Sequence, residues 1–276
     1  MDRIRLIASD MDATLLDEQS QLPADFEETI HALAELGIRF APASGRPLYT
    51  LEELFPTLRD ELVFIGDNGG AIRWKGQNLF TSEMSPEGWR ALNRLTREQG
   101  DIAVLCGLES AYVERPFAVH DAVLRHFYTK IEYVDRLEDV TAPADKFTIY
   151  LPQHNAQQAY DTVYASQRSI YSVAVAGECW VDIMNPGVHK GAALQTLGQL
   201  WGLPPECIMA FGDTYNDAEM LQTVRYGFLM ENGSEPLRQK VPFLAPSHRE
   251  AGVMQVLHRV LAQNGCVCPE DFVPAH

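Results

Sequence analysis

Short apolar segments alternate with amphipathic ones over the first and last parts of this chain, and no other feature constrains its fold as strongly. The apolar runs are typical of strands buried on both faces: 4–9, 38–44, 62–70, 207–213 and 226–230. Between them lie segments with apolar residues three and four apart, as on a helix: 22–37, 47–58, 190–203, 216–224, 235–241 and 251–265. This alternation predicts an α/β fold with a parallel sheet, and residues 71–82 are predicted to form a hairpin.

The pattern changes in the middle of the chain. Helical patterns cover 85–100, 120–128 and 155–167, whereas strand patterns cover 101–114, 145–152 and 171–185. Helices mixed with paired strands are typical of a separate α+β module. We therefore expect a core domain built from residues 1–82 and 186–276, with residues 83–185 inserted as a second domain.

Charge and cysteine content exclude several classes of partner. The 276 residues are 46% hydrophobic and carry a net charge of −16. So acidic a chain is a poor binder of nucleic acid or of an anionic membrane, although a small anionic substrate stays possible in a cleft with local cations. Five scattered cysteines do not form a disulfide framework, and no apolar run is long enough to span a membrane. We expect a cytoplasmic monomer or homodimer.

Polar residues follow the ends of four predicted strands. In an open α/β sheet, ligands bind beyond the carboxyl ends of the strands, so these residues are predicted to share one site: Asp10 with Asp12, Ser44 with Arg46, Asp67 with Asn68, and Asp213 with Asn216 and Asp217. Taken singly, each cluster is equally well explained by turns and helix caps. Four such clusters together point to a site.

Asp10 and Asp12 lie one residue apart at the end of an apolar run. Buried carboxylates are costly unless a cation neutralises them or the two groups hold different protonation states. If strand geometry persists, both face the same side, and Asp213 can meet them there. Three carboxylates without histidine or cysteine suit Mg²⁺ better than zinc.

Four motifs, in order along the chain, resemble those of the haloacid dehalogenase superfamily of phosphotransferases. They are the Asp-x-Asp-x-Thr pattern in "DMDATLL", the strand-ending serine in "ASGRP", Lys190 in "HKGAAL" and the Gly-Asp-x-x-Asn-Asp pattern in "GDTYND". The insert between the second and third motifs resembles the C2 cap of the Cof-type subfamily, as does the turn "DNGG". The resemblance implies a Rossmann-like, doubly wound core with an inserted C2-type cap.

The resemblance also implies roles for individual residues. Asp10 is the nucleophile that forms an aspartyl-phosphate, and Asp12 is the general acid and base. Mg²⁺ is held by Asp10, Asp213 and the backbone carbonyl of Asp12, with Asp217 behind them. The phosphate contacts come from Ser44, Gly45, Arg46, Lys190 and Asn216. Ala13 stands where the family usually has glycine, and we expect it to be tolerated unless the backbone there needs a positive φ.

The predicted function is a Mg²⁺-dependent phosphatase of small phosphorylated metabolites, with sugar phosphates favoured. Two alternatives stay open within the same motifs: a phosphomutase, and a phospho-ligand sensor that does not turn over. A structural cation-binding protein is a third, but it leaves Lys190 and Ser44 unexplained. In the insert, either packing or contact with the leaving group explains Arg115, Cys179 and Trp180.

Overall fold

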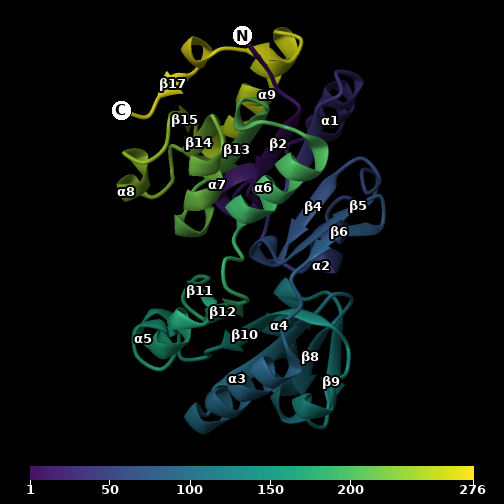
Figure 1. Cartoon of the computed structure of the whole chain (residues 1–276), viewed down its shortest axis with the longest axis vertical. Coiled ribbons are helices and arrows are strands. Elements are labelled where there is room, and N and C mark those ends of the chain that lie inside the picture. The colour runs from purple at the N-terminus through teal and green to yellow at the C-terminus, as the bar shows by residue number, and fades with distance from the viewer.

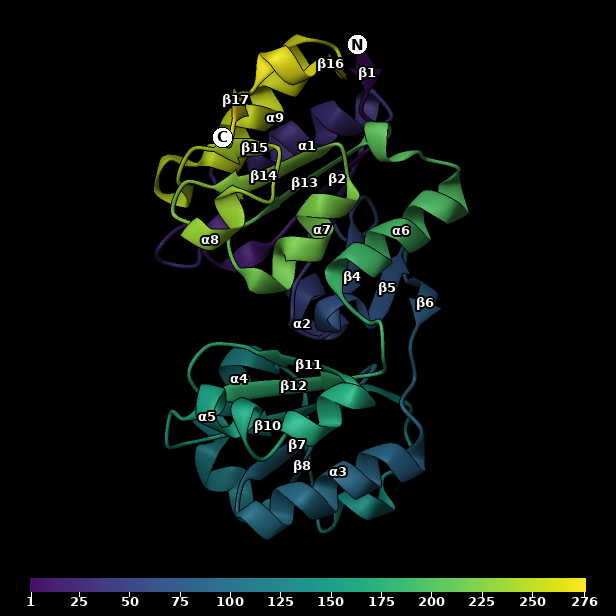
Figure 2. The same ribbon diagram turned by 60° about the vertical axis from the view of Figure 1, so that its left-hand side comes forward.

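The computed structural model describes residues 1–276 and forms two lobes (Figure 1). One lobe contains both termini, and the other consists of the central part of the chain. Two extended segments, between β6 and α3 and between β12 and α6, join them (Figure 2). We call them the core lobe and the cap lobe and propose boundaries near residues 82 and 186. No helix has both the length and the apolar character to cross a membrane.

The core lobe is built on a six-stranded sheet in the order β17-β15-β14-β13-β2-β3. Only β17 is antiparallel to its neighbour. The strands are β2 (Leu6–Ser9), β3 (Arg39–Pro42), β13 (Ile208–Gly212), β14 (Tyr226–Met230), β15 (Phe243–Ala245) and β17 (Val273–Pro274). The sequence missed β15 and β17, which are only three and two residues long.

Helices cover both faces of this sheet. Successive residues of a strand point to opposite faces, so Ile7 packs in one apolar cluster while Leu6 and Ala8 pack in another. The first cluster includes α1 (Phe26–Glu35), α2 (Leu48–Glu53) and α9 (Gly252–Ala262); the second includes α6 (Lys190–Trp201), α7 (Ala218–Thr223) and α8 (Glu235–Arg238). This arrangement confirms the predicted α/β, doubly wound core.

The third predicted strand departs from the parallel arrangement. Strand β4 (Val63–Gly66) pairs antiparallel with β5 (Ala71–Trp74), which pairs with β6 (Gln77–Thr81). A single parallel bridge, Ala43 to Ile65, links this small sheet to the chain after β3. The reason is the intervening turn: three consecutive residues with positive φ, Asp67 to Gly69, reverse the chain at once.

The cap lobe holds a second six-stranded sheet, ordered β11-β12-β10-β7-β8-β9. All its pairings are antiparallel except β8 with β9. The strands are β7 (Ile102–Gly107), β8 (Ala111–Glu114), β9 (Ile131–Val134), β10 (Ala144–Tyr150), β11 (Ser172–Val175) and β12 (Trp180–Met184). The helices are α3 (Pro86–Gln99), α4 (Asp121–Phe127) and α5 (Ala156–Asp161). The predicted helix 155–167 stops early because Thr162 and Val163 are β-branched, which disfavours helix.

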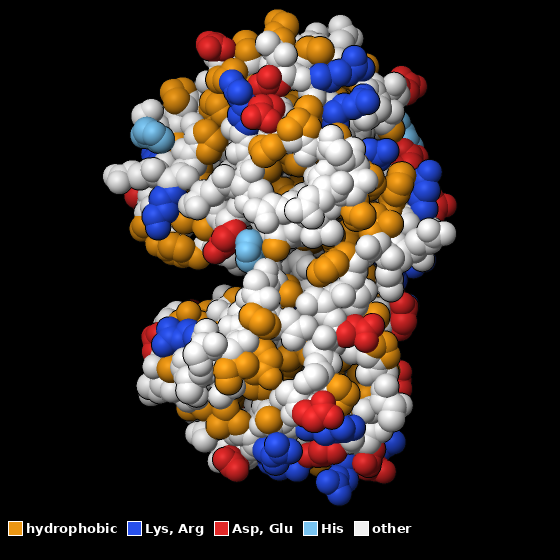
Figure 3. Space-filling view, viewed as in Figure 1, with side chains coloured by type: hydrophobic (Ala, Val, Ile, Leu, Met, Phe, Trp, Pro, Cys, Tyr) orange, Lys and Arg blue, Asp and Glu red, His pale blue; other side chains and the backbone are white.

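Alternation along the cap strands decides what faces the core lobe. Phe147 and Ile149 of β10 and Val181 of β12 pack under α3 and α5. The intervening residues Lys146 and Asp182 lie on the opposite face, where they contact residues of the core lobe. A hollow separates the lobes between α7 and β11 (Figure 3). The remaining strands, β1 (Asp2–Arg3) and β16 (Cys266–Val267), pair with each other.

Candidate active site

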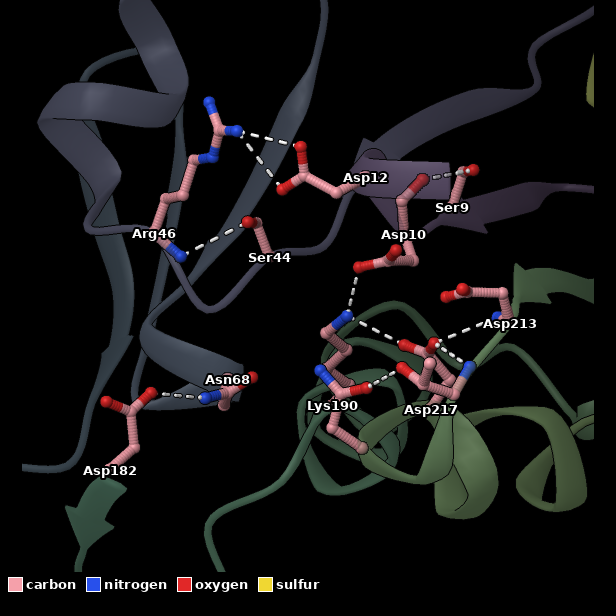
Figure 4. A network of polar contacts seen from close by, with 12 residues as sticks. Ser9, Asp10, Asp12, Ser44, Arg46, Asn68, Asp182, Lys190, Asp213 and Asp217 are labelled. Carbon is pink, nitrogen blue, oxygen red and sulfur yellow. Dashed lines mark hydrogen bonds and ion pairs between the residues drawn. The ribbon is translucent and has the colours of Figure 1, made fainter. Parts of the chain in front are cut away.

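Two neighbouring parallel strands position the first pair of carboxylates. Asp10 directly follows β2, and its backbone N–H donates to the carbonyl of Phe211 in β13 at 2.9 Å. Asp213 directly follows β13. The carboxyl ends of the two strands therefore place Asp10 and Asp213 at one edge of the sheet (Figure 4), where an α/β fold binds its ligands.

Lys190 reaches this edge from the first residue of α6. Its side chain is fully buried, and its ammonium donates to Asp10 and, at 2.7 Å, to Asp217. Helix α6 packs closely on α7 here, because a Cβ at Gly191 would lie 2.7 Å from the backbone of Glu219. The ring of His189 accepts a hydrogen bond from the N–H of Ala192 at 3.2 Å, so it caps this helix.

Asp217 links the lysine to the turn after β13. One carboxylate oxygen binds Lys190, while the other accepts from the N–H groups of Asp213 at 3.0 Å and Thr214 at 3.2 Å. Gly212 makes room for it, since a Cβ there would lie 2.4 Å from the Cβ of Asp217. The spacing of glycine and aspartate in "GDTYND" thus has a steric reason.

The charges at this edge do not balance. Carboxylate oxygens of Asp10, Asp213 and Asp217 lie within 4.8 Å of one another, and the one ammonium in contact with them is that of Lys190. Burial, reinforced by the neighbouring carboxylates, raises the pKa of Asp10 to about 8 and that of Asp213 to about 6. Burial alone would lower the Lys190 pKa, but Asp10 and Asp217 outweigh it and raise that pKa.

The donor atoms here suit a divalent cation. All three side chains offer oxygen, with no nitrogen or sulfur ligand, and the excess of negative charge is what a cation would compensate. A hard ion such as Mg²⁺ binds carboxylates together with substrate oxygens and water. The residues present therefore fit the Mg²⁺ ion that the resemblance implies.

Asp12 points elsewhere, which corrects the expectation from strand alternation. Strand geometry ends at Ser9, and residues 11–15 form a tight turn in which Ala13 has φ 58°. The side chain of Asp12 is 57% exposed and accepts two hydrogen bonds from Arg46, at 2.8 and 3.1 Å. Its carboxylate lies outside the group formed by Asp10 and Asp213, although all three line the same cleft.

The remaining phosphate-binding candidates line the same cleft, but their polar groups contact neighbouring residues of the protein. The hydroxyl of Ser44 accepts from the N–H of Arg46 at 3.1 Å, and the side chain of Asn68 lies over Gly45, 3.2 Å from where a Cβ would stand. The amide oxygen of Asn216 accepts from the hydroxyl of Thr214 at 2.6 Å.

The sequence reasoning missed a buried charge cluster that joins the lobes. Lys146 of the cap donates to the carbonyl of Gly45 at 2.5 Å and pairs with Asp67 at 3.0 Å and Asp182 at 3.4 Å. Asp182 in turn accepts from Asn68 at 3.0 Å. The turn residues 67 and 68 thus also hold the cap. The available signal was a charged residue inside a predicted strand: Asp182 stands among apolar residues in β12, and Lys146 lies in β10 between Asp145 and Phe147.

The cap candidates separate by position. Cys179 and Trp180 line a cleft of about 720 Å³ together with Asp10 and Ser44. Arg115 does not line it and instead pairs with Asp135 at 2.8 Å on the surface. Arg115 therefore lies away from this cleft, whereas Cys179 and Trp180 stay candidates for contact with the leaving group.

A doubly wound core, an inserted α+β cap and carboxylates gathered at the strand ends together define a class of protein. The chain belongs to the haloacid dehalogenase-like hydrolases: the family's model matches residues 7–257. This result confirms the family that the four motifs resemble, and the relatives described next, which are named as phosphatases, confirm a phosphatase enzyme.

Individual relatives cover almost the whole chain. The chain is 31% identical to the 5-amino-6-(5-phospho-D-ribitylamino)uracil phosphatase YbjI of Escherichia coli K12, over 94% of this chain and 96% of that protein. It is 30% identical to the HMP-PP phosphatase of Cronobacter sakazakii, over 87% and 89%. A crystal structure from Streptococcus mutans UA159 superposes with a TM-score of 0.85 at 28% identity, covering 94% and 99%.

Proposed function

We propose that this protein is a Mg²⁺-dependent phosphatase that hydrolyses phosphate monoesters of small metabolites through an aspartyl-phosphate at Asp10. The observation that carries the proposal is the meeting of Asp10, Asp213 and Asp217 with Lys190 at the carboxyl edge of the sheet. Burying several charges together is costly, and a purely structural protein gains nothing from it. A site that attacks and holds a phosphoryl group requires such charges.

The first step is an in-line displacement at phosphorus. A carboxylate oxygen of Asp10 forms a bond to phosphorus while the bond from phosphorus to the leaving oxygen breaks. Asp12, acting as the general acid, gives a proton to that oxygen, so the alcohol departs neutral. Lys190 and Ser44 hold the other phosphoryl oxygens and offset their charge.

The second step releases phosphate. Asp12, now a carboxylate, takes a proton from a water molecule that attacks phosphorus, and the bond to Asp10 breaks. Asp12 suits both steps because its side chain is exposed to the cleft and to solvent. Arg46, which pairs with Asp12 here, keeps it oriented and is free to contact a phosphate oxygen once substrate enters.

Asp10, Asp213 and the backbone carbonyl of Asp12 are proposed to hold Mg²⁺, with Asp217 fixing Lys190 and the turn after β13. When bound, the cation neutralises charge on the phosphoryl oxygens and allows Asp10 to attack as a carboxylate. The raised pKa of Asp10 and of Asp213 supports this assignment, because both groups lack sufficient counter-charge in the protein alone.

The substrate is proposed to be a small phosphorylated metabolite, a class that includes the sugar phosphates favoured from the sequence. The two relatives above are named as phosphatases of small phosphorylated molecules. The acidic chain and its five free cysteines support a cytoplasmic setting without nucleic-acid or membrane partners.

The test is phosphate release from a generic aryl phosphate and from a panel of sugar phosphates. Release that needs Mg²⁺, stops with EDTA and is absent in Asp10→Asn is the expected result. Recovery of an isomerised ester in place of free phosphate would indicate a phosphomutase. Tight binding of phosphate esters with no product at all would indicate a sensor.

A further inference from the structure

The cap contributes an apolar wall to the cleft in front of Asp10. The core side of this cleft carries the groups proposed to bind phosphate, including Asp10, Ser44 and Arg46. The cap side carries mainly apolar side chains: Val123, Phe127, Tyr128, Val175, Cys179 and Trp180. A substrate bound through its phosphate would therefore extend its leaving group toward this wall.

Three aromatic residues, Phe127, Tyr128 and Trp180, line the wall, and their rings contact one another. The ring of Trp180 meets that of Phe127 edge to face, at 5.1 Å between centroids and 67° between planes. Tyr150 packs against Trp180 with 4.7 Å between the ring centroids, and it does not line the cleft. Aromatic side chains fixed in this way offer a large contact area at little cost in conformational entropy.

The polar groups on the cap side are already paired. Lys146 is engaged with Asp67, Asp182 and the carbonyl of Gly45. His154 and Glu178 pair with each other at 3.2 Å in the open, with side chains 64% and 83% exposed. A leaving group rich in hydroxyls needs free donors and acceptors to replace its water, and this wall offers few.

We propose that Phe127 and Trp180 form the leaving-group subsite and that they select phosphate esters of alcohols bearing a planar, apolar ring over esters of bare sugars. This inference rests on the proposed phosphatase function and narrows its substrate class. Aromatic residues also pack against sugars, but such sites add hydrogen bonds to the hydroxyls, and the buried polar groups of this wall, Lys146 and Asp182, are already paired.

Three esters test the proposal with matched leaving groups. Benzyl phosphate, cyclohexylmethyl phosphate and glucose 6-phosphate each carry a six-membered ring on a CH₂–O–phosphate group. Their differences in kcat/KM with Mg²⁺ therefore report mainly on the ring. We expect benzyl phosphate to exceed glucose 6-phosphate by at least about tenfold, the range over which an apolar pocket discriminates, with cyclohexylmethyl phosphate between them.

Variants of Phe127 and Trp180 test whether these two side chains cause the preference for benzyl phosphate. Trp180→Leu and Phe127→Leu should raise KM for benzyl phosphate about tenfold and leave glucose 6-phosphate within about twofold, whereas Trp180→Phe should keep much of the preference. Trp180 is almost fully buried, so the half-buried Phe127 preserves the test if the Trp180→Leu variant does not fold. Trp74→Leu, on a core-lobe hairpin outside the cleft, is the matched control.

Two results overturn the inference while leaving the phosphatase in place. One is glucose 6-phosphate turning over as well as benzyl phosphate. The other is an equal loss for all three esters in the Phe127 and Trp180 variants, which would mean that the rings only support the fold. If none of the three esters, nor a generic aryl phosphate, releases phosphate, the proposed function itself has failed.

Discussion

At the scale of single residues, the central feature is a buried carboxylate without enough counter-charge. Asp10 shares Lys190 with Asp217 and lies near Asp213. Burial first, then these carboxylates, raises its pKa. A group in this state is poised to accept a cation, because the cation supplies the charge that the protein withholds.

Stability should therefore depend on pH and on Mg²⁺ together. The folded pKa values of Asp10, about 8, and Asp213, about 6, lie above the unfolded value. Their contribution to stability is thus full below about pH 4 and is lost as pH rises through the folded values. Mg²⁺ favours the ionised forms, so it should raise Tm more at pH 8 than at pH 5.

Thermal unfolding in EDTA and in Mg²⁺ at the two pH values measures this effect. Asp10→Asn is the control, and we expect it to flatten the pH dependence and to reduce the gain from Mg²⁺. A gain of equal size at both pH values, or one unchanged in Asp10→Asn, would contradict this account of the carboxylates.

Ala13 occupies a backbone conformation that favours glycine. Its φ of 58° lies in the left-handed region, where a Cβ costs about 1–2 kcal/mol. Glycine relieves that strain but adds freedom to the unfolded chain, worth about 0.5–1 kcal/mol. Ala13→Gly should therefore leave stability unchanged or raise it by up to about 1.5 kcal/mol, as judged by urea unfolding.

The matched control is Ala32→Gly inside α1, where glycine should lower stability by about 1 kcal/mol. Equal losses for the two variants would mean that the turn after Asp12 relaxes around alanine. The sequence raised the question of Ala13 but did not answer it, because φ at a single position is set by the turn as a whole.

At the scale of elements, strand β10 carries the cation that holds the cap against the core. Lys146 is 1% exposed and pairs with Asp67 and Asp182. Lys146→Met would leave both carboxylates buried without a counter-charge, which typically costs about 3–5 kcal/mol. Because burial already raises the Asp67 pKa, protonation relieves the charge at low pH, so the loss should be larger at pH 8 than at pH 5.

Urea unfolding of Lys146→Met at both pH values tests this expectation. Arg115→Met provides the comparison, since its ion pair with Asp135 is exposed at both ends and should change stability by less than about 1 kcal/mol. If both substitutions cost the same, the buried cluster does not support the interface.

The strands differ in how well the sequence pattern predicted them. Continuous apolar runs identified β2, β13 and β14, because burial on both faces leaves a strong pattern. The hairpin partner of β4 could not be predicted, since the reversal depends on positive φ values at Asp67 and Asn68. The divergence of Asp10 and Asp12 was missed because alternation was assumed to continue to residue 12, whereas the strand ends at Ser9 and a tight turn with positive φ at Ala13 follows.

At the scale of the whole molecule, the motifs located the core half of the site and left the cap half open. Three of the four motifs lie at the ends of the neighbouring strands β3, β2 and β13, so their meeting follows from sheet topology, and Lys190 joins them from the start of α6. Contacts such as Lys146 with Asp67 depend on how two lobes pack, which no local pattern encodes. Only the alternate positions Lys146 and Thr148 of β10 and the single polar residue Asp182 of β12 hinted at a polar face.

The lobes together make the cleft: the core supplies the proposed nucleophile, and the cap supplies the wall around the leaving group. A separated core would keep the carboxylates and lose that wall. The account as a whole therefore depends on whether Asp10 itself becomes phosphorylated during turnover.

The most direct measurement is to quench turnover with borohydride and to map the modified residue by mass spectrometry of peptides. An aspartyl-phosphate is reduced to homoserine, so conversion of Asp10, dependent on substrate and Mg²⁺, is the predicted result. Asp10→Asn should show no conversion and a loss of at least about a thousandfold in kcat. Conversion at another residue, or substantial turnover by Asp10→Asn, would contradict the account.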